Sequence, residues 1–452
     1  MAFEGSRAVT AALHATRRAR VLDAMTARQA SHGGAAVLLV PSAPVFVRNN
    51  DVEHEYRQDS DLHYLTGFSE PESVLVLDTR GRTSTLFVRP RDKDREIWDG
   101  PRAGVDGVRT DFGIDRSFTI QEFDAELPKL LGDCRRVYTR LGVNRAFDEK
   151  LFATIEGMKR RQRTGVGWPT EFVDSATLVH EMRLVKDDGD LRAMRTAADI
   201  TREAHERVMA AAKPGAFEYE MEAILLDTFR RRGAERPAYG SIVGSGPNAT
   251  ILHYRSNDRR MEDGDLLLVD AGAEFEYLAS DVTRTFPVNG RFSKPQRAIY
   301  EIVLEAQLAS IAKSTVGATM ESVHAASVEV ITRGLVKLGL LTGDVGELVA
   351  KEAYKPFYMH RTGHWLGMDV HDVGTYYLDG KPRPFAPGVV TTVEPGIYIG
   401  RDYDAVPAEW RGIGVRIEDD ILVTSEGPVN LTAAIPKTVE EVERACSSST
   451  SR

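Results

Sequence analysis

Acidic residues at the ends of apolar strands are the first candidates for chemistry in this sequence. Asp270 closes the run LLLVD, and Asp281 lies in Tyr277–Val288, a segment rich in Val, Thr, Phe and Tyr that predicts a second strand. Burying two carboxylates close together is costly unless a positive group lies between them. A metal ion is the simplest such group, although a hairpin with two solvated acids explains this segment equally well by itself.

A cluster of histidines supplies the next candidates. His360, His364 and His371 lie within twelve residues of a chain that holds only 11 histidines. The His-x-x-x-His spacing is found in helical metalloproteases, but Arg361 stands where their general-base glutamate would be. The glycines in and after this motif indicate instead a loop whose backbone fits tightly. We expect one or two of these histidines to bind a metal and the others to contact a substrate.

Two further acids follow or interrupt apolar strands near the end of the chain. Glu394 follows the predicted strand Val389–Val393, and Glu418 lies in the predicted strand Val415–Val423 on the same face as Arg416. An arginine beside buried carboxylates can orient them through its paired N–H groups.

These residues together form an oxygen-rich set of four carboxylates and one imidazole: Asp270, Asp281, His364, Glu394 and Glu418. Four negative charges suit two hard divalent cations better than one zinc ion. We therefore expect two divalent metal ions, with Mn²⁺ favoured over Co²⁺ and Zn²⁺. Two metals about 3.5–4 Å apart can share a water, lower its pKa and present hydroxide to a carbonyl group.

Length and composition limit the class of protein. A chain of 452 residues exceeds one ordinary core, and 42% hydrophobic with 28% charged residues is typical of a soluble globular protein. The net charge of −9 disfavours a nucleic-acid partner. No apolar run reaches the ~20 residues of a membrane span, so we expect a cytoplasmic protein with no membrane partner.

Strand and helix patterns predict two domains and a tail. Residues 1–178 alternate strands and helices, which indicates an α/β domain. Residues 179–444 combine long helices, such as Leu191–Ala212, with the strands that carry the acids, which indicates an α+β domain. The Ser-rich tail, residues 445–452, is predicted to be disordered.

The order of these motifs resembles that of the pita-bread metallopeptidases, and among them the proline-specific aminopeptidase P group. The resemblance covers nearly the whole chain. It is carried by residues 359–374 (MHRTGHWLGMDVHDVG), by residues 56–71 (YRQDSDLHYLTGFSEP), and by His253, Asp270, Asp281, Glu394-Pro-Gly and Arg416-x-Glu418. It implies a creatinase-like N-terminal domain, a pita-bread catalytic domain and a homo-oligomer, either a dimer or a tetramer.

The resemblance also implies a reaction. A metal-bridging hydroxide would hydrolyse the bond between an N-terminal residue and a following proline, with Glu394 relaying the proton. Asp281 and Glu418 would bridge the metals, with Asp270 completing one metal's shell and His364 and Glu394 the other's. The implied catalytic residues are His253, His371, Glu394 and Arg416. The implied substrate-binding residues are His253, His360, His371 and Trp98, the last from its own or a neighbouring subunit.

Other functions share parts of this pattern. A prolidase, which cuts only Xaa-Pro dipeptides, has the same five ligands and stays open. The long N-terminal domain and the arrangement of His360 and His371 disfavour a methionine aminopeptidase. A non-catalytic pita-bread binding protein and a metal-free creatinase-type hydrolase are disfavoured because all five ligand positions are kept.

Overall fold

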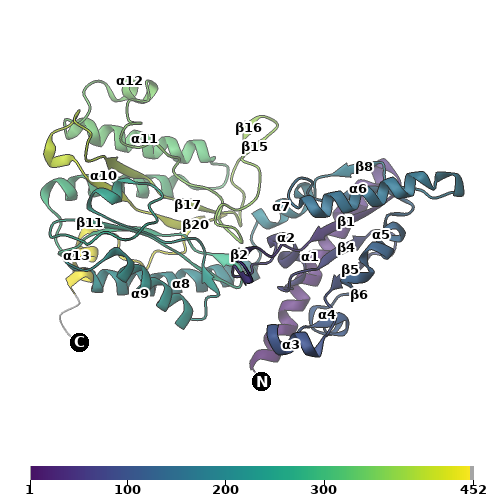
Figure 1. The fold of residues 1–452 in the computed structure, drawn as a ribbon. Coiled ribbons are helices and arrows are strands. Elements are labelled where there is room, and N and C mark those ends of the chain that lie inside the picture. Colours follow the sequence, from purple (N-terminus) through teal and green to yellow (C-terminus); the bar gives the residue numbers. More distant parts are fainter. Residues whose placement is uncertain (1, 448–452) are drawn as a thin grey trace. The chain divides into compact units, whose positions relative to one another are not determined.

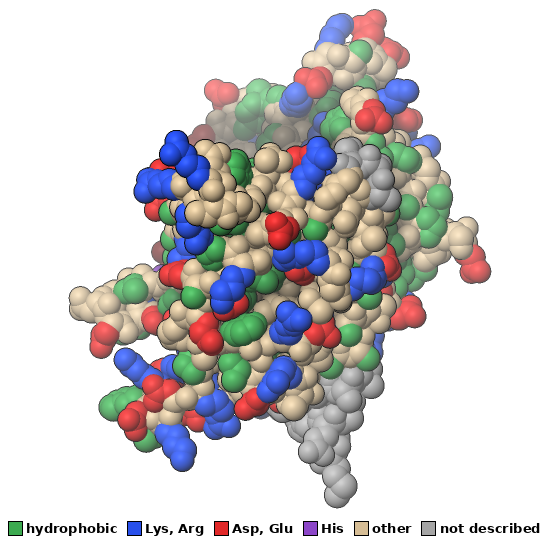
Figure 2. Space-filling view, turned by 90° about the vertical axis from the view of Figure 1, so that its right-hand side faces the viewer, with side chains coloured by type: hydrophobic (Ala, Val, Ile, Leu, Met, Phe, Trp, Pro, Cys, Tyr) green, Lys and Arg blue, Asp and Glu red, His purple; other side chains and the backbone are tan. Residues whose placement is uncertain are grey.

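The computed structural model describes residues 2–447 and shows two compact units, which meet in the sequence between Arg183 and Leu184 (Figure 1). Among the described residues, no helix has both the length and the apolar character needed to cross a bilayer. On the face of the molecule in Figure 2, acidic and basic side chains are interspersed.

The first unit is built on a six-stranded mixed sheet with the order β6-β5-β4-β1-β7-β8. Its central strand β1 pairs antiparallel with β4 and parallel with β7. Alternate residues of β1, Val37 and Leu39, pack with apolar residues of α5 and α6 in one core. The helices are α1 (Ala2–His32), α2 (Ser60–Thr66), α3 (Lys93–Asp99), α4 (Gly104–Phe112), α5 (Phe123–Leu131), α6 (Arg145–Arg160) and α7 (Ala176–Leu184). The strands are β1 (Ala35–Pro41), β2 (Val47–Asn49), β3 (Val52–Glu53), β4 (Val74–Asp78), β5 (Thr83–Val88), β6 (Arg116–Thr119), β7 (Cys134–Tyr138) and β8 (Glu171–Val173).

The second unit places short antiparallel sheets between two helical layers. In Figure 1, α10 and α11 lie on one side of the strands and α8 and α9 on the other. The helices are α8 (Asp188–Ala211), α9 (Glu218–Arg231), α10 (Lys294–Lys313), α11 (Met320–Lys337), α12 (Val345–Ala350) and α13 (Val439–Ser447). The strands are β9 (Arg236–Pro237), β10 (Ile242–Ser245), β11 (Leu266–Asp270), β12 (Ala273–Phe275), β13 (Leu278–Ala279), β14 (Thr283–Pro287), β15 (Tyr377–Leu378), β16 (Lys381–Pro382), β17 (Val390–Val393), β18 (Gly396–Ile399), β19 (Ile413–Arg416), β20 (Asp419–Thr424) and β21 (Gly427–Asn430). This unit is α+β, as its sequence predicts.

Three local predictions need correction. The single strand predicted over Val415–Val423 is two strands, because β19 pairs with β18 while β20 pairs with β17. The strand predicted over Tyr277–Val288 is likewise divided, and Asp281 lies in the break between β13 and β14. Residues 445–447 of the predicted disordered tail form the end of α13, whereas residues 448–452 lie outside the described residues.

Candidate metal centre

Strand register brings the predicted acids of the second unit together. Asp270, the last residue of β11, pairs with Thr283 of β14, two residues beyond Asp281. The backbone N–H of Glu418 donates to the carbonyl oxygen of Thr283 at 3.1 Å, which places the gap between β19 and β20 beside β14. Glu394 directly follows β17. Strand ends and the short segments between strands therefore present the acidic side chains to a common space.

Three of the predicted ligands form a compact cluster. Asp281, His364 and Glu418 each offer one ligand atom, and these atoms all lie within 4.8 Å of one another. The His364 Nε2 atom is 3.4 Å from Asp281 Oδ2 and 3.5 Å from Glu394 Oε1. His364 Nδ1 lies 3.0 Å from the Trp365 carbonyl oxygen, which can only accept, so Nδ1 carries a proton and Nε2 is the ring nitrogen that faces the acids.

The electrostatics of the cluster fit divalent cations. Burial, and then the charges of Asp281, Glu394 and Asp270, raise the pKa of Glu418 well above its usual value. Burial also raises the pKa of Glu394 to about 7, against the opposing effects of His364 and Arg416. Burial lowers the pKa of His364, but Asp281 and Glu394 outweigh it and raise that pKa to about 9. The protein thus concentrates more negative charge than its own cations offset, which a bound metal would relieve.

Arg416 is the protein's own cation at this site, and its guanidinium holds three partners. Its Nη2 donates to Asp270 Oδ2 at 2.6 Å, its Nε to Thr283 Oγ1 at 2.9 Å, and its Nη1 to the Tyr398 hydroxyl at 3.0 Å. Thr283 in turn donates its hydroxyl proton to Glu418 Oε2 at 2.6 Å. Arg416 therefore orients one predicted ligand directly and a second through Thr283.

Two tyrosines and a threonine at this site were missed by the sequence analysis. The Tyr239 hydroxyl lies 2.6 Å from Asp270 Oδ1 and 2.5 Å from Asp281 Oδ1. Burial, followed by the charge of Asp270, raises the pKa of Tyr239 well above its usual value, so it stays a hydroxyl. Tyr239 follows a two-residue strand and carries no motif, whereas Thr283 and Tyr398 stand two and four residues from recognised acids.

The predicted substrate-binding histidines adjoin the cluster. The imidazole of His371 lies with its centroid 4.3 Å from that of His364. His360 Nδ1 contacts the Arg361 carbonyl oxygen at 2.7 Å, so its Nε2 accepts a hydrogen bond from the Tyr398 hydroxyl at 2.9 Å. Burial and then Arg416 lower the pKa of His360 to about 3, so this ring is neutral. His253, on an exposed loop, contributes electrostatically to the lowered pKa of both His360 and His371.

A closely packed glycine lies in the loop that contains His360 and His364, as the sequence predicts. A Cβ atom on Gly363 would lie 2.0 Å from the carbonyl oxygen of Thr392. Thr392 also bonds His364, because its Oγ1 accepts the His364 N–H at 3.1 Å and its own N–H donates to the His364 carbonyl oxygen at 2.9 Å. Only glycine permits this close approach beside the predicted ligand.

Trp98, the remaining predicted substrate-binding residue, belongs to the first unit and lies on its surface. Trp98 lies on α3 with 85% of its surface exposed, and its neighbour Ile97 is 79% exposed.

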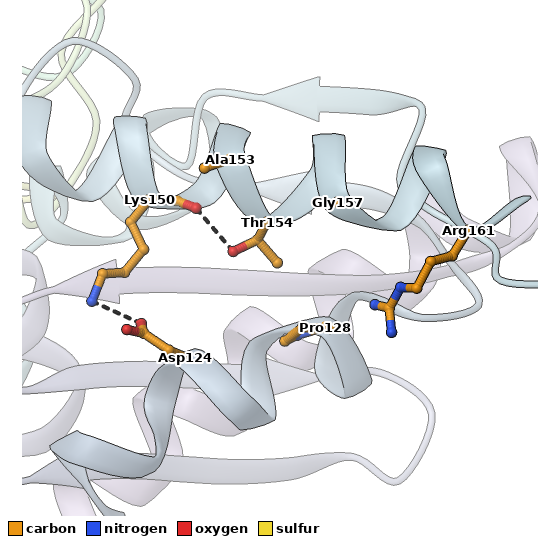
Figure 3. Close-up of a pocket in the computed structure, with 7 residues that line it drawn as sticks. All are labelled: Asp124, Pro128, Lys150, Ala153, Thr154, Gly157 and Arg161. Carbon is orange, nitrogen blue, oxygen red and sulfur yellow. Dashed lines mark hydrogen bonds and ion pairs between the residues drawn. The ribbon is translucent and has the colours of Figure 1, made fainter.

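An open depression between α5 and α6 is shown in Figure 3. It is lined by Asp124, Pro128, Lys150, Ala153, Thr154, Gly157 and Arg161. Lys150 Nζ forms an ion pair with Asp124 Oδ1 at 2.8 Å. None of the residues that line the depression is among the candidate site residues.

Family models match both units. The model described as "Metallopeptidase family M24" matches residues 192–425, and "Aminopeptidase P, N-terminal domain" matches residues 14–138. The chain belongs to metallopeptidase family M24. Its M24 unit has the pita-bread fold and is preceded by the aminopeptidase P type N-terminal domain, as expected from the sequence.

Individual M24 relatives cover almost the entire chain. The Xaa-Pro aminopeptidase of Escherichia coli is 45% identical over 418 residues, which are 92% of this chain and 94% of the relative. A solved aminopeptidase structure from Pseudomonas aeruginosa is 50% identical, with a TM-score of 0.94 over 98% of this chain and 99% of that one. Zinc-substituted E. coli aminopeptidase P in complex with product is 42% identical, with a TM-score of 0.93 over 98% of this chain and 99% of that one.

Proposed function

We propose that this M24 protein is a metallo-aminopeptidase that removes the N-terminal residue from peptides whose second residue is proline. The observation that carries the proposal is the convergence of ligand atoms from Asp281, His364 and Glu418 within 4.8 Å, with predicted substrate-binding histidines beside them. The E. coli relative named Xaa-Pro aminopeptidase supports the substrate class.

We infer that the site holds two divalent ions, with Mn²⁺ favoured. Asp281 and Glu418 would lie between the ions, Asp270 would hold one, and His364 and Glu394 would hold the other. When bound, the ions would polarise the scissile carbonyl and supply an ionised water at neutral pH.

The chain's own residues would bind the substrate and move its proton. Glu394 would accept the proton of the attacking water and pass it to the leaving proline nitrogen. His253 and His371 would donate hydrogen bonds to the substrate and to the oxyanion. Arg416 would hold Asp270 and Thr283 in place throughout. Proline lacks the backbone N–H through which other residues of a peptide substrate can hydrogen-bond to an enzyme's backbone. Its ring therefore needs a side-chain surface to pack against, and the neutral ring of His360 would provide one.

A homo-oligomer is part of the proposal. Trp98 and Ile97 present exposed apolar surface from a helix whose residues are otherwise exposed or half-buried. Such adjacent apolar side chains are typical of interaction surfaces, and a second copy of the chain is the partner we infer. We assign Trp98 to substrate binding in the assembled enzyme. A cytoplasmic location stays a prediction.

Product analysis by mass spectrometry tests the substrate class. We expect the Mn²⁺-loaded protein to release the first residue from Xaa-Pro-Yaa and from longer Xaa-Pro peptides, and EDTA to abolish the release. Turnover of the Xaa-Pro dipeptide alone would identify a prolidase instead. No turnover with Mn²⁺, Co²⁺ or Zn²⁺ would favour a non-catalytic binding protein.

A further inference from the structure

A buried ion pair joins the segment that precedes α8 to the loop of residues 366–374, which carries His371. Lys186 Nζ is 2.8 Å from Asp372 Oδ2, and each side chain is only 1% exposed. We propose that Lys186 is a positioning residue: through Asp372 it fixes the loop of residues 366–374 and so sets the place of the His371 ring.

Lys186 is itself held by hydrogen bonds to neighbouring backbone carbonyl groups. Its backbone N–H donates to the Gly388 carbonyl oxygen at 2.8 Å, and its Nζ also donates to the Leu184 carbonyl oxygen at 3.2 Å. The adjacent Val185 forms a β-bridge with Val389, just before β17. The ammonium group is therefore tied to the strand that leads into Glu394.

Residues 366–374 form an irregular loop that depends on Asp372. The Asp372 N–H donates to the Trp365 carbonyl oxygen at 2.9 Å, and Asp372 Oδ1 accepts the Asp369 N–H at 3.4 Å. A Cβ atom on Gly367 would lie 2.1 Å from Asp372 Oδ2 and 2.8 Å from Lys186 Cε. The loop is thus folded closely around the ion pair.

The same loop carries His371 and meets the metal centre. Asp372 is buried while His371, the preceding residue, is exposed and packs its ring against His364. The Gly367 carbonyl oxygen accepts the N–H of Ala279 at 2.8 Å, two residues before Asp281. A shift at Asp372 would therefore displace His371 relative to the ligands.

The effect on catalysis follows from the charges. Without Lys186, the Asp372 carboxylate would be buried without this cation, and the loop would move to hydrate it. A displacement of about 1 Å in a substrate-contacting group can cost about 100-fold in rate. We expect Lys186→Met to lower kcat/KM by about 10–100-fold at unchanged metal content. This expectation rests on the proposed function.

A double-mutant cycle with His371→Ala tests the route of the effect. If Lys186 acts through His371, Lys186→Met costs its full factor in the wild type and less than about twofold in the His371→Ala background. An equal loss in both backgrounds would overturn the proposal. Lys351→Met, which breaks an exposed pair with Glu347, is the control and should leave kcat/KM unchanged. If Lys186→Met fails to fold, Lys186→Met/Asp372→Asn removes both charges together and takes its place in the cycle.

Hydrogen exchange tests the loop independently of activity. We expect faster amide exchange in residues 366–374 of Lys186→Met, but not of Lys351→Met, and unchanged exchange there would overturn the proposal. If the wild type cleaves no Xaa-Pro peptide, the proposed function fails, and the exchange result alone decides whether Lys186 holds this loop.

Discussion

Arg416 and Asp270 form a buried ion pair with 2.6 Å between Nη2 and Oδ2, although 146 residues separate them in the sequence. The pair joins the end of β19 to the end of β11, and the same guanidinium reaches Thr283 and Tyr398. One side chain therefore orients Asp270 directly and Glu418 through the Thr283 hydroxyl. A guanidinium can do this because its planar fork holds several acceptors at once.

Replacing Arg416 should impair activity more than folding. Arg416→Lys keeps the positive charge near Asp270 but cannot hold all three partners. We expect kcat/KM to fall about 10–100-fold, as for other residues that orient metal ligands. The melting temperature, measured by calorimetry, should fall by only a few degrees. Arg411→Lys, which alters hydrogen bonds to Val406, is the control. Unchanged kinetics would contradict the role given to Arg416.

Asp281→Asn should remove metal binding without unfolding the protein. An amide lacks the negative charge that the Asp281 carboxylate would offer to a divalent cation. We expect isothermal titration with Mn²⁺ to show that one ion binds at least ~100-fold more weakly or no longer binds. This exceeds the loss of about 10–100-fold that is typical when a residue that only orients a metal ligand is replaced. The exposed Asp263→Asn should titrate like the wild type. Wild-type affinity in Asp281→Asn would refute its place in the site.

Tyr239→Phe tests a residue without a sequence signature. The substitution removes a hydroxyl that lies between Asp270 and Asp281 and leaves the ring in place. We expect Mn²⁺ affinity to fall about 10-fold, because these carboxylates lose a shared partner that restrains them. The exposed Tyr219→Phe is the matched control. Equal affinities for the two variants would show that the Tyr239 hydroxyl does not restrain the ligands.

A buried histidine beneath β11 should make stability depend on pH. His205 is fully buried, its Nε2 lies 3.0 Å from the Ala271 carbonyl oxygen, and burial lowers its pKa to about 4. Between pH 6.5 and 4, the unfolded chain therefore binds a proton at His205 that the native protein does not. Stability is lost as pH falls across this window, by roughly 3 kcal/mol at pH 4.

The contribution of His205 can be isolated with a neutral substitute. His205→Gln can still donate to the Ala271 carbonyl oxygen but does not titrate. Urea unfolding of metal-free protein between pH 7.5 and 4 should show a shallower loss of stability in His205→Gln than in the wild type. Parallel curves for the two proteins would exclude His205 as a source of the pH dependence.

Short-range patterns identified most of the candidate residues that the fold brings together, and part of the fold itself. Asp270 and Glu394 could be identified because the first ends an apolar strand and the second follows one. The tight contact at Gly363 could be expected from its place between two histidines. The sequence did not indicate where the predicted strands are interrupted. The change from β19 to β20, for example, depends on which strands they pair with, β18 and β17. Tyr239 was missed for the same reason, since only the fold brings its hydroxyl to the acids.

A matched pair of peptides tests the central claim most directly. The pair is Xaa-Pro-Yaa and Xaa-Ala-Yaa with identical flanking residues, assayed with Mn²⁺-loaded wild type and with Glu394→Gln. We predict release of the first residue from the proline peptide only, abolished by EDTA and reduced at least ~100-fold in Glu394→Gln, the scale on which proton transfer contributes. Equal cleavage of both peptides, or full activity in Glu394→Gln, would contradict the proposed function.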